Sequence, residues 1–330
     1  MKLIAAFLLS LVVAASALAA ETPYPALLVL NKGGSLAIVN PATNKVVARV
    51  RTGPVPHEVT VSDDGRLAFT SNYGAFEPEK EGRTISMIGL ASQKELRRLD
   101  LGPLRRPHGL AFANGELYFT AELNKLIARY DPKADKLDWY LGTGQNRTHM
   151  IEVSKDHNKI YTSNVDSGTI SIIERSSGPE RWIQTVVPAG KGPEGFDISP
   201  DGQQLWAAGS GDGQVHIIDL ASHKETDSID IHTKRSNRLR FTPDGKLVLV
   251  SDLPTGDVIV LDAASHAERK RIHVGSSAAG ILIPPDGQRA YIACTADNNV
   301  AILNLQTFEI EGRIQTGKQP DGMAWVPKRQ

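Results

Sequence analysis

The stretch PDGQQLWAAG, residues 200–209, joins a turn signal to a short apolar strand, and five other segments of the chain repeat that arrangement. Their turn residues, Gly65, Gly115, His157, Gly202, Gly245 and Gly287, are 50, 42, 45, 43 and 42 positions apart. A nearly fixed period of this length is typical of repeat architectures, in which each copy is one supersecondary unit. The other copies are DDGRLAFTSN at 63, ANGELYFTAE at 113, KDHNKIYTSN at 155, PDGKLVLVSD at 243 and PDGQRAYIAC at 285.

Each unit continues through alternating strands such as TISII (169–173) and a third strand such as KVVARV (45–50). With the strand before each turn this makes four short strands, which is typical of a propeller blade. The end segment GKQPDGMAWVP (317–327) is an inner strand without a partner, and PALLVLNKGG (25–34) lacks an inner strand. Pairing the two satisfies both exposed edges. The sequence therefore predicts an all-β, seven-bladed β-propeller of four-stranded antiparallel blades, closed by pairing the N-terminal strand with the C-terminal blade.

The repeats resemble those of the YVTN β-propeller family, which read roughly G-x-x-P-x-G-x-A-x-S-P-D-G followed by a Y-V-T-N strand. GKGPEGFDISPDG (190–202) and IYTSN (160–164) show the pattern most plainly, and the resemblance covers about residues 24 to 327. It implies a seven-bladed propeller similar to lactonase-like and YncE-like proteins. Similar propellers serve as lactonases, lyases, haem-binding domains and interaction modules, so the resemblance implies a fold and leaves the function open.

Residues 1–20, MKLIAAFLLSLVVAASALAA, have a cationic start, an apolar run and a small-residue cleavage pattern, which predicts a bacterial-type signal peptide. We expect residues 21–330 to form one propeller domain, periplasmic or secreted, monomeric and without a membrane span. Loss of Lys2 leaves 36 cationic against 37 acidic side chains, a formal charge of −1, which does not favour nucleic acid as a partner. Cys294 is the only cysteine, so no internal disulfide is possible.

One position of the repeat points to a functional site at one end of the disc. Counting back eight residues from each turn residue, or seven in the second repeat, reaches equivalent positions that should stand around one mouth of the channel. Histidines occupy this position in three consecutive blades, and a glutamate follows in the next. The full set, with the residue of the composite blade, is His57, His108, His149, Glu194, Asn237, Ala279 and Asp321.

Two residues before this position, Arg106, Arg147 and Arg235 should crown the same opening. Guanidinium groups bind carboxylate and phosphate in a bidentate manner, so these arginines favour a small anionic ligand, although they could simply solvate the loops. We count Asn72, Glu122, Asn164 and Asp252, at the ends of the YVTN-like strands, as rim positions.

Three imidazoles with a carboxylate, His57, His108, His149 and Glu194, form a possible site for zinc or another divalent metal ion. Blades diverge toward the ~10 Å separation of packed sheets, so such a site requires side chains that turn to the axis. The alternative, drawn from the resemblance, is structural: a histidine after proline whose ring bonds the backbone of the neighbouring blade.

Three functions follow from these patterns. The leading one is an exported binding propeller whose mouth, with Asn237 and Asp321 among its residues, captures a small anionic ligand, a metal ion or an acidic segment of a protein partner. The second is a lactonase-like hydrolase or lyase that uses the same histidines as acid and base. The third is an interaction scaffold acting through the long loop at 73–83. The chain contains no G-x-S-x-G, H-E-x-x-H, G-x-x-x-x-G-K-[ST] or C-x-x-C-H motif that would decide among them.

Overall fold

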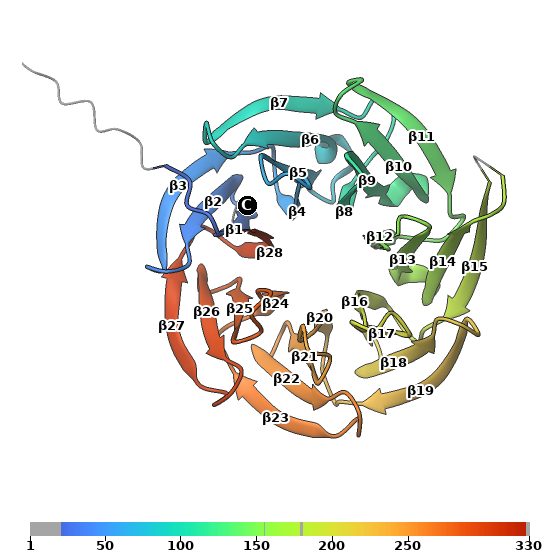
Figure 1. Cartoon of the computed structure of the whole chain (residues 1–330), viewed down its shortest axis with the longest axis vertical. Coiled ribbons are helices and arrows are strands. Elements are labelled where there is room, and N and C mark those ends of the chain that lie inside the picture. The colour runs from blue at the N-terminus through green and yellow to red at the C-terminus, as the bar shows by residue number, and fades with distance from the viewer. Residues whose placement is uncertain (1–20, 155, 179–180, 328–330) are drawn as a thin grey trace, which may run out of the picture.

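The computed structural model describes residues 21–154, 156–178 and 181–327, and the predicted signal peptide at 1–20 lies outside these residues. Seven four-stranded antiparallel sheets follow one another around a common axis (Figure 1). The predicted all-β, seven-bladed propeller is therefore confirmed. Among the described residues, no helix is long and apolar enough to cross a membrane. The helices in the described part of the chain are single 3₁₀ turns, η1 (Pro78–Lys80), η2 (Glu122–Asn124) and η3 (Val165–Ser167).

Six blades follow the chain order, and the strands of each run in sequence from the axis outward. Blades 1 to 3 consist of β4 (Pro56–Val61), β5 (Leu67–Gly74), β6 (Glu81–Gly89) and β7 (Lys94–Asp100); β8 (Pro107–Ala113), β9 (Glu116–Ala121), β10 (Leu126–Asp131) and β11 (Lys136–Gly142); β12 (Thr148–Val153), β13 (Lys159–Asn164), β14 (Thr169–Arg175) and β15 (Trp182–Pro188). Blades 4 to 6 consist of β16 (Pro193–Ile198), β17 (Gln204–Gly209), β18 (Gln214–Asp219) and β19 (Lys224–Asp230); β20 (Ser236–Phe241), β21 (Leu247–Asp252), β22 (Asp257–Asp262) and β23 (Glu268–His273); β24 (Ala278–Leu282), β25 (Arg289–Cys294), β26 (Asn299–Asn304) and β27 (Ile310–Gln315).

Blade 7 contains strands from both ends of the described chain. It consists of β28 (Pro320–Val326), β1 (Ala26–Asn31), β2 (Ser35–Asn40) and β3 (Lys45–Arg51). β1 and β28 are antiparallel, with Ala26 opposite Val326 and Leu28 opposite Ala324. All six residues of β1 are buried, because neighbouring blades cover both faces of the sheet. This explains why its sequence, ALLVLN, is a continuous apolar run rather than an alternating one.

Each inner strand loses its register with the second strand of its blade just after its first residue, as a β-bulge does. In blade 2 the bulge turns the Gly109 N–H out of the ladder, and the Thr120 hydroxyl accepts it at 2.9 Å. Thr120 in turn donates to the His149 carbonyl of blade 3 at 2.6 Å. Ser163 and Ser251 make the same two bonds in their blades. We call this contact the hydroxyl relay; it ties the bulges of blades 2, 3 and 5 to the next blade.

The hydroxyl relay also depends on close approach of neighbouring inner strands. A Cβ atom on Gly109 would lie 2.5 Å from the His149 carbonyl oxygen, so a side chain there would push the two blades apart. The relay and the glycine therefore fix the height at which His149 enters the mouth of the channel.

The hydroxyl relay should contribute measurably to stability. Replacing Thr120 by valine keeps the shape but leaves the buried Gly109 N–H and His149 carbonyl without this partner. Each such loss costs about 1–3 kcal/mol. We expect Thr120→Val to lower the free energy of unfolding by about 2 kcal/mol or more, measured by urea denaturation. Thr120→Ser, which keeps the hydroxyl, should stay much closer to the wild type. Equal denaturation midpoints for the valine variant and the wild type would show that the relay is dispensable.

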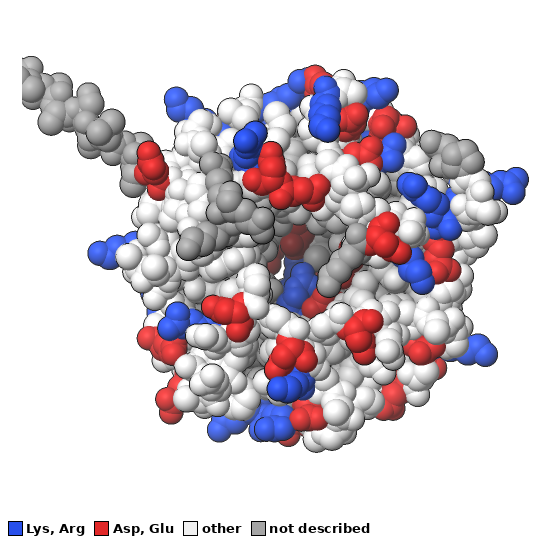
Figure 2. Space-filling model, in the orientation of Figure 1, with Lys and Arg blue, Asp and Glu red and all other residues white. Residues whose placement is uncertain are grey.

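Ion pairs cross the channel between blades that are not neighbours. Arg238 of β20 pairs with Glu58 of β4, and both side chains are buried. Two residues further along β20, Arg240 lies 3.4 Å from Glu152 of β12, two blades away, and 3.8 Å from Asp197 of β16 in the neighbouring blade. Figure 2 shows one face of the disc hollowed at its centre, with cationic and acidic side chains inside the hollow. Charged side chains therefore occupy the channel at two levels, and it is not an apolar core.

The two carboxyl groups near Arg240 make stability depend on pH. Burial, together with the nearby charge of Asp197, raises the pKa of Glu152 well above its usual range. A group whose pKa is higher in the folded state stabilises the fold below its unfolded pKa, and that contribution is lost as pH rises through the folded pKa. Glu152→Gln mimics the protonated form and should remove this loss.

We therefore expect Glu152→Gln to be more stable relative to the wild type at pH 8 than at pH 5, measured by denaturation at both values. Glu309→Gln, at an exposed position, is the matched control and should show no such change between the two pH values. A pH-independent difference for Glu152→Gln would contradict the assigned protonation.

Candidate functional site

The second residue of every inner strand faces one cavity of about 180 Å³ at one mouth of the channel. All of these side chains except that of His57 belong to buried residues. They are the same seven positions that counting along the repeat placed together: His57, His108, His149, Glu194, Asn237, Ala279 and Asp321. We call them the first ring.

Neighbouring members of the first ring touch one another, so the side chains do turn to the axis. His57 Nδ1 lies 3.2 Å from His108 Nε2, and the rings of His108 and His149 stack with their centroids 3.6 Å apart. His149 Nε2 lies 4.0 Å from Glu194 Oε1, which also accepts a hydrogen bond of 2.9 Å from Asn237. Among the described residues, the hydrogen bonds of these imidazoles go to side chains. The alternative in which the rings bond the backbone of the next blade is therefore not what this structure shows.

A second ring stands beside the first, and counting along the repeat did not identify it. In every blade the first residue of the inner strand pairs with a residue at the end of the second strand, or two residues before its end in blade 1, where the partner is Asn72. The residue after that partner comes next toward the mouth. These second-ring residues are Lys32, Tyr73, Glu122, Val165, Ser210, Leu253 and Thr295. Lys32 bonds Asp321 of the first ring at 2.9 Å, and Tyr73 donates to Glu122 Oε2 at 2.6 Å.

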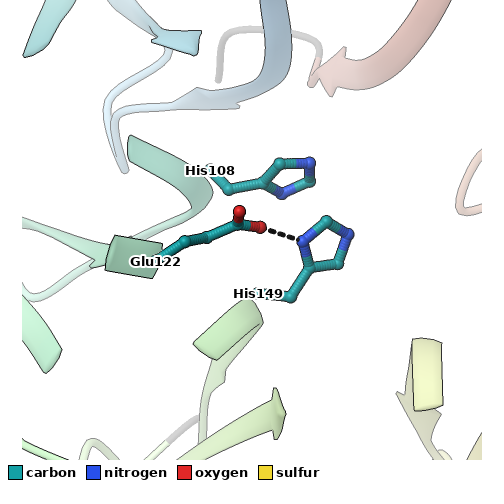
Figure 3. Close-up of side chains that lie close together, drawn as sticks. All are labelled: His108, Glu122 and His149. Atoms are coloured by element: carbon teal, nitrogen blue, oxygen red, sulfur yellow. Dashed lines mark hydrogen bonds and ion pairs between the residues drawn. The ribbon is translucent and has the colours of Figure 1, made fainter. Parts of the chain in front are cut away.

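Glu122 completes a cluster with two histidines of the first ring. Its Oε1 bonds His149 Nδ1, and the donor atoms of His108, Glu122 and His149 all lie within 4.8 Å of one another. Figure 3 shows the Glu122 carboxylate pointing toward both imidazoles. The sequence pattern predicts Glu194 as the acidic ligand. Glu194 instead lies on the far side of His149, and His57 reaches the cluster only through His108.

The position of Glu122 differs from the rim position assigned from sequence. Counting aligns it with Asn72, Asn164 and Asp252, but the ladder places Ala121 level with Asn72 and Glu122 level with Tyr73. Asn72 and Asp252 each accept a hydrogen bond of 2.9 Å from the loop that enters the inner strand of their blade, from the Gly53 and Arg235 N–H groups. Asn164 donates to Thr169, at the start of the strand that follows it. Blade 2 has alanine where these blades have asparagine or aspartate. A count based on polar residues therefore slips by one position.

Burial sets the charges of the cluster. Burial, helped by the positive charge of Lys32, lowers the pKa of His57 to about 3. Burial and the neighbouring His149 hold the pKa of His108 well below its usual range. Burial acts to raise the pKa of Glu122, but the hydrogen bonds from His149 and Tyr73 outweigh it, so that pKa falls. At neutral pH the mouth therefore contains the neutral imidazoles of His57 and His108 beside the ionised carboxylate of Glu122.

Two ring nitrogens of the cluster have no partner. His108 Nδ1 and His149 Nε2 are buried and make no hydrogen bond among the described residues. Leaving such a group unsatisfied costs about 1–3 kcal/mol, so it calls for an explanation such as a ligand. Neutral imidazole nitrogens and a carboxylate are also the donor types that zinc and related divalent ions prefer.

The three predicted arginines do not behave alike. Arg147 and Arg235 line the central cavity, where they lie 3.8 Å from Glu122 and 3.7 Å from Glu194. Arg106 turns away from that cavity and pairs with Glu81 at 3.1 Å. Arg106 and Arg147 have backbone φ values of 52° and 54°, in the left-handed region that residues other than glycine rarely adopt. Because the equivalent residue has a positive φ in six of the seven blades, this geometry belongs to the repeat.

The interval predicted as a long loop, 73–83, is mostly an extended hairpin. β5 runs to Gly74 and β6 starts at Glu81, and these two residues face each other in the ladder. Tyr73 is 1% exposed and lies inside the mouth, whereas Phe76, in the tip of the hairpin, is 67% exposed. The insertion therefore adds an aromatic wall to the site instead of a free loop.

Comparison with known proteins supports the fold. No family model matches the chain, and no curated protein matches it. Among solved structures, a functionally unknown protein from Desulfotomaculum acetoxidans superposes with a TM-score of 0.75 at 10% identity, over 93% of this chain and 100% of that one. A Bacteroides fragilis protein provisionally assigned as a 6-phosphogluconolactonase gives 0.73 at 14%, over 92% and 99%. Hydrazine synthase from Kuenenia stuttgartiensis gives 0.69 at 20%, over 81% and 88%. By architecture, the chain is a seven-bladed propeller, and it shares this fold with these neighbours.

Proposed function

We propose that the mouth of the channel binds a divalent transition metal ion through His108, Glu122 and His149, and that the bound ion captures a small anionic ligand. The observation that carries the proposal is the pair of buried imidazoles with unpartnered nitrogens beside an ionised carboxylate. Because the pKa of His108 is already low, its imidazole is neutral at neutral pH and does not have to lose a proton before it binds the metal ion.

The donor set suits zinc in size and charge. Ligands of a tetrahedral zinc ion at ~2.1 Å lie ~3.4 Å from one another, so donors within 4.8 Å reach it after small side-chain rotations. Two neutral imidazoles and one carboxylate leave the site with a positive charge. A three-residue set also leaves a coordination position open for another molecule. Arg147, which lies at the edge of the same cavity, adds to the attraction for an anion.

Zinc binding to the chelator-treated protein tests the proposal by calorimetry. We expect one equivalent of Zn²⁺ to bind, and Co²⁺ to give the absorption of a four-coordinate site. Glu122→Gln and His149→Gln should weaken binding by more than the about 10–100-fold typical of losing a residue that only supports a ligand. Tyr73→Phe, which removes the hydrogen bond to Glu122, should show that smaller loss.

His216→Gln is the matched control, because His216 is also buried between two carboxylates, Asp212 and Glu225, but lies outside the mouth. It should bind zinc as the wild type does. The metal proposal fails if the wild type takes up no stoichiometric Zn²⁺, or if the variants of Glu122 and His149 bind it unchanged.

A second candidate function is hydrolysis of a lactone, and the hydrogen bond between Glu122 and His149 favours it. A carboxylate that holds one imidazole nitrogen orients the ring, and the other nitrogen, His149 Nε2, has no partner and belongs to the cavity lining. That arrangement suits a general base that activates water. Arg147 is placed to stabilise the negative charge that develops on the carbonyl oxygen.

A panel of lactones, assayed by acid release with and without chelator, separates the two functions. If His149 is a general base, turnover should persist after metal removal, and His149→Gln should reduce it about 10²–10⁴-fold. Turnover that needs added zinc would assign the cluster to the metal. An absence of turnover in both conditions, with zinc bound, would leave ligand capture as the function.

A further inference from the structure

A second cavity, of about 390 Å³, lies beside the mouth at blades 1 to 3. Tyr73, Phe76 and Arg147 line both this side cavity and the central one, so the two share a wall. Glu122, proposed above as a metal ligand, also lines the side cavity. The volume lies within the about 300–1,000 Å³ common for small-molecule sites. The side cavity is therefore large enough for the body of a ligand whose end reaches the mouth.

Arg147 is the cation best placed to receive such a ligand. Its side chain is 27% exposed, and its closest acidic atoms, on Glu122 and Asp166, are both 3.8 Å away. Among the described residues its guanidinium makes no hydrogen bond, although the group has five N–H donors. Both Glu122 oxygens are already bonded, to His149 and Tyr73. A carboxylate or phosphate on the ligand would supply the bidentate partner that Arg147 lacks.

The other cations of the side cavity have different roles. Arg106 is held by Glu81 at 3.1 Å and by the Phe76 carbonyl at 2.9 Å, so it supports the wall. Lys125 is exposed, and its ammonium group forms no ion pair within the described part of the chain. Arg147 and Lys125 are therefore the two cations available to an acidic ligand.

The outer wall of the side cavity is apolar. Phe76 and Leu123 are 67% and 47% exposed, and both line the side cavity. The Phe76 ring is held in place, because the Arg106 guanidinium lies 4.9 Å from its centroid and the Tyr73 ring meets it edge-on at 5.8 Å. An aromatic or aliphatic group laid against this fixed ring would gain area and stacking energy.

We infer that the side cavity binds a small organic acid with an apolar or aromatic body. Its acid group pairs with Arg147 and Lys125, and its body lies against Phe76 and Leu123. The side cavity stands independently of the metal. Only the further step, in which the acid group also reaches the ion at Glu122, rests on the proposed function.

Three probes test this inference on the chelator-treated protein by calorimetry: phenylacetate, its uncharged amide phenylacetamide, and inorganic phosphate. We expect phenylacetate to bind, and the other two to bind at least tenfold more weakly. Arg147→Gln should weaken phenylacetate binding tenfold or more. Arg66→Gln is the control, because Arg66 is an exposed arginine that lines neither cavity, and it should have little effect.

The apolar wall is tested in the same way. Phe76→Ala should weaken phenylacetate binding about 2–10-fold, the loss expected for one aromatic contact. Ile183→Ala, at a residue that is 61% exposed on an outer strand, is the control and should change nothing. The inference is wrong if phenylacetamide binds as well as phenylacetate, if the two arginine variants behave alike, or if phosphate binds equally well and Phe76→Ala has no effect.

Repeating the titration after zinc loading separates this inference from the metal proposal. Phenylacetate binding that requires Arg147 in protein that takes up no zinc would keep the side cavity and remove the metal. Stoichiometric zinc uptake, without phenylacetate binding to the chelator-treated or the zinc-loaded protein, would keep the metal proposal and overturn the side-cavity inference. Tighter phenylacetate binding after zinc loading would place the acid group at the ion.

Discussion

The hydroxyl relay between neighbouring blades is the contact on which the mouth of this propeller depends. A β-bulge at the start of each inner strand turns the second residue toward the axis but removes the third residue's N–H from the ladder. In blades 2, 3 and 5 a buried hydroxyl accepts that N–H and donates to the next blade. The hydroxyl therefore gives the N–H released by the bulge a partner, and its bond to the next blade sets the position of the next first-ring residue. A side chain such as His149 is held by its neighbour's backbone geometry before any side-chain contact forms.

Two rings of side chains result, and their chemistry is uneven around the disc. The imidazoles occupy consecutive blades, and the second ring supplies Glu122 and Tyr73 on that same side. The extended hairpin of blade 1 adds Phe76 there as well. On the opposite side Ala279 contributes no polar group. The combination of low pKa values at His57 and His108 with an ionised Glu122 arises because burial penalises charge on the imidazoles while hydrogen bonds stabilise it on the carboxylate.

Below the mouth, ion pairs join blades that lie across the channel from one another. Arg238 and Glu58 lie at the third position of their inner strands, where four other blades have glycine and blade 3 has Met150, and they meet from blades that are not neighbours. Burying such a pair is favourable only when both partners stay together, so each fixes the other. Arg238 also lines the central cavity, so the pair lies directly next to the first ring at the mouth.

The sequence by itself determined the seven blades and the first ring, because both depend on a period that can be counted along the chain. His57, His108 and His149 were placed at one mouth in this way. Only the tertiary structure decided which residues form the cluster of His108, Glu122 and His149. Glu122 lies one residue further along the second strand than the sequence count places it, and the count misses this because blade 2 has Ala121 where other blades have asparagine or aspartate. The pairing of Glu58 with Arg238 across 180 positions was equally hidden. Counting along the repeat assigns a residue to a ring. Contact between side chains depends on how far each side chain reaches across the axis, and the repeat period does not predict that distance.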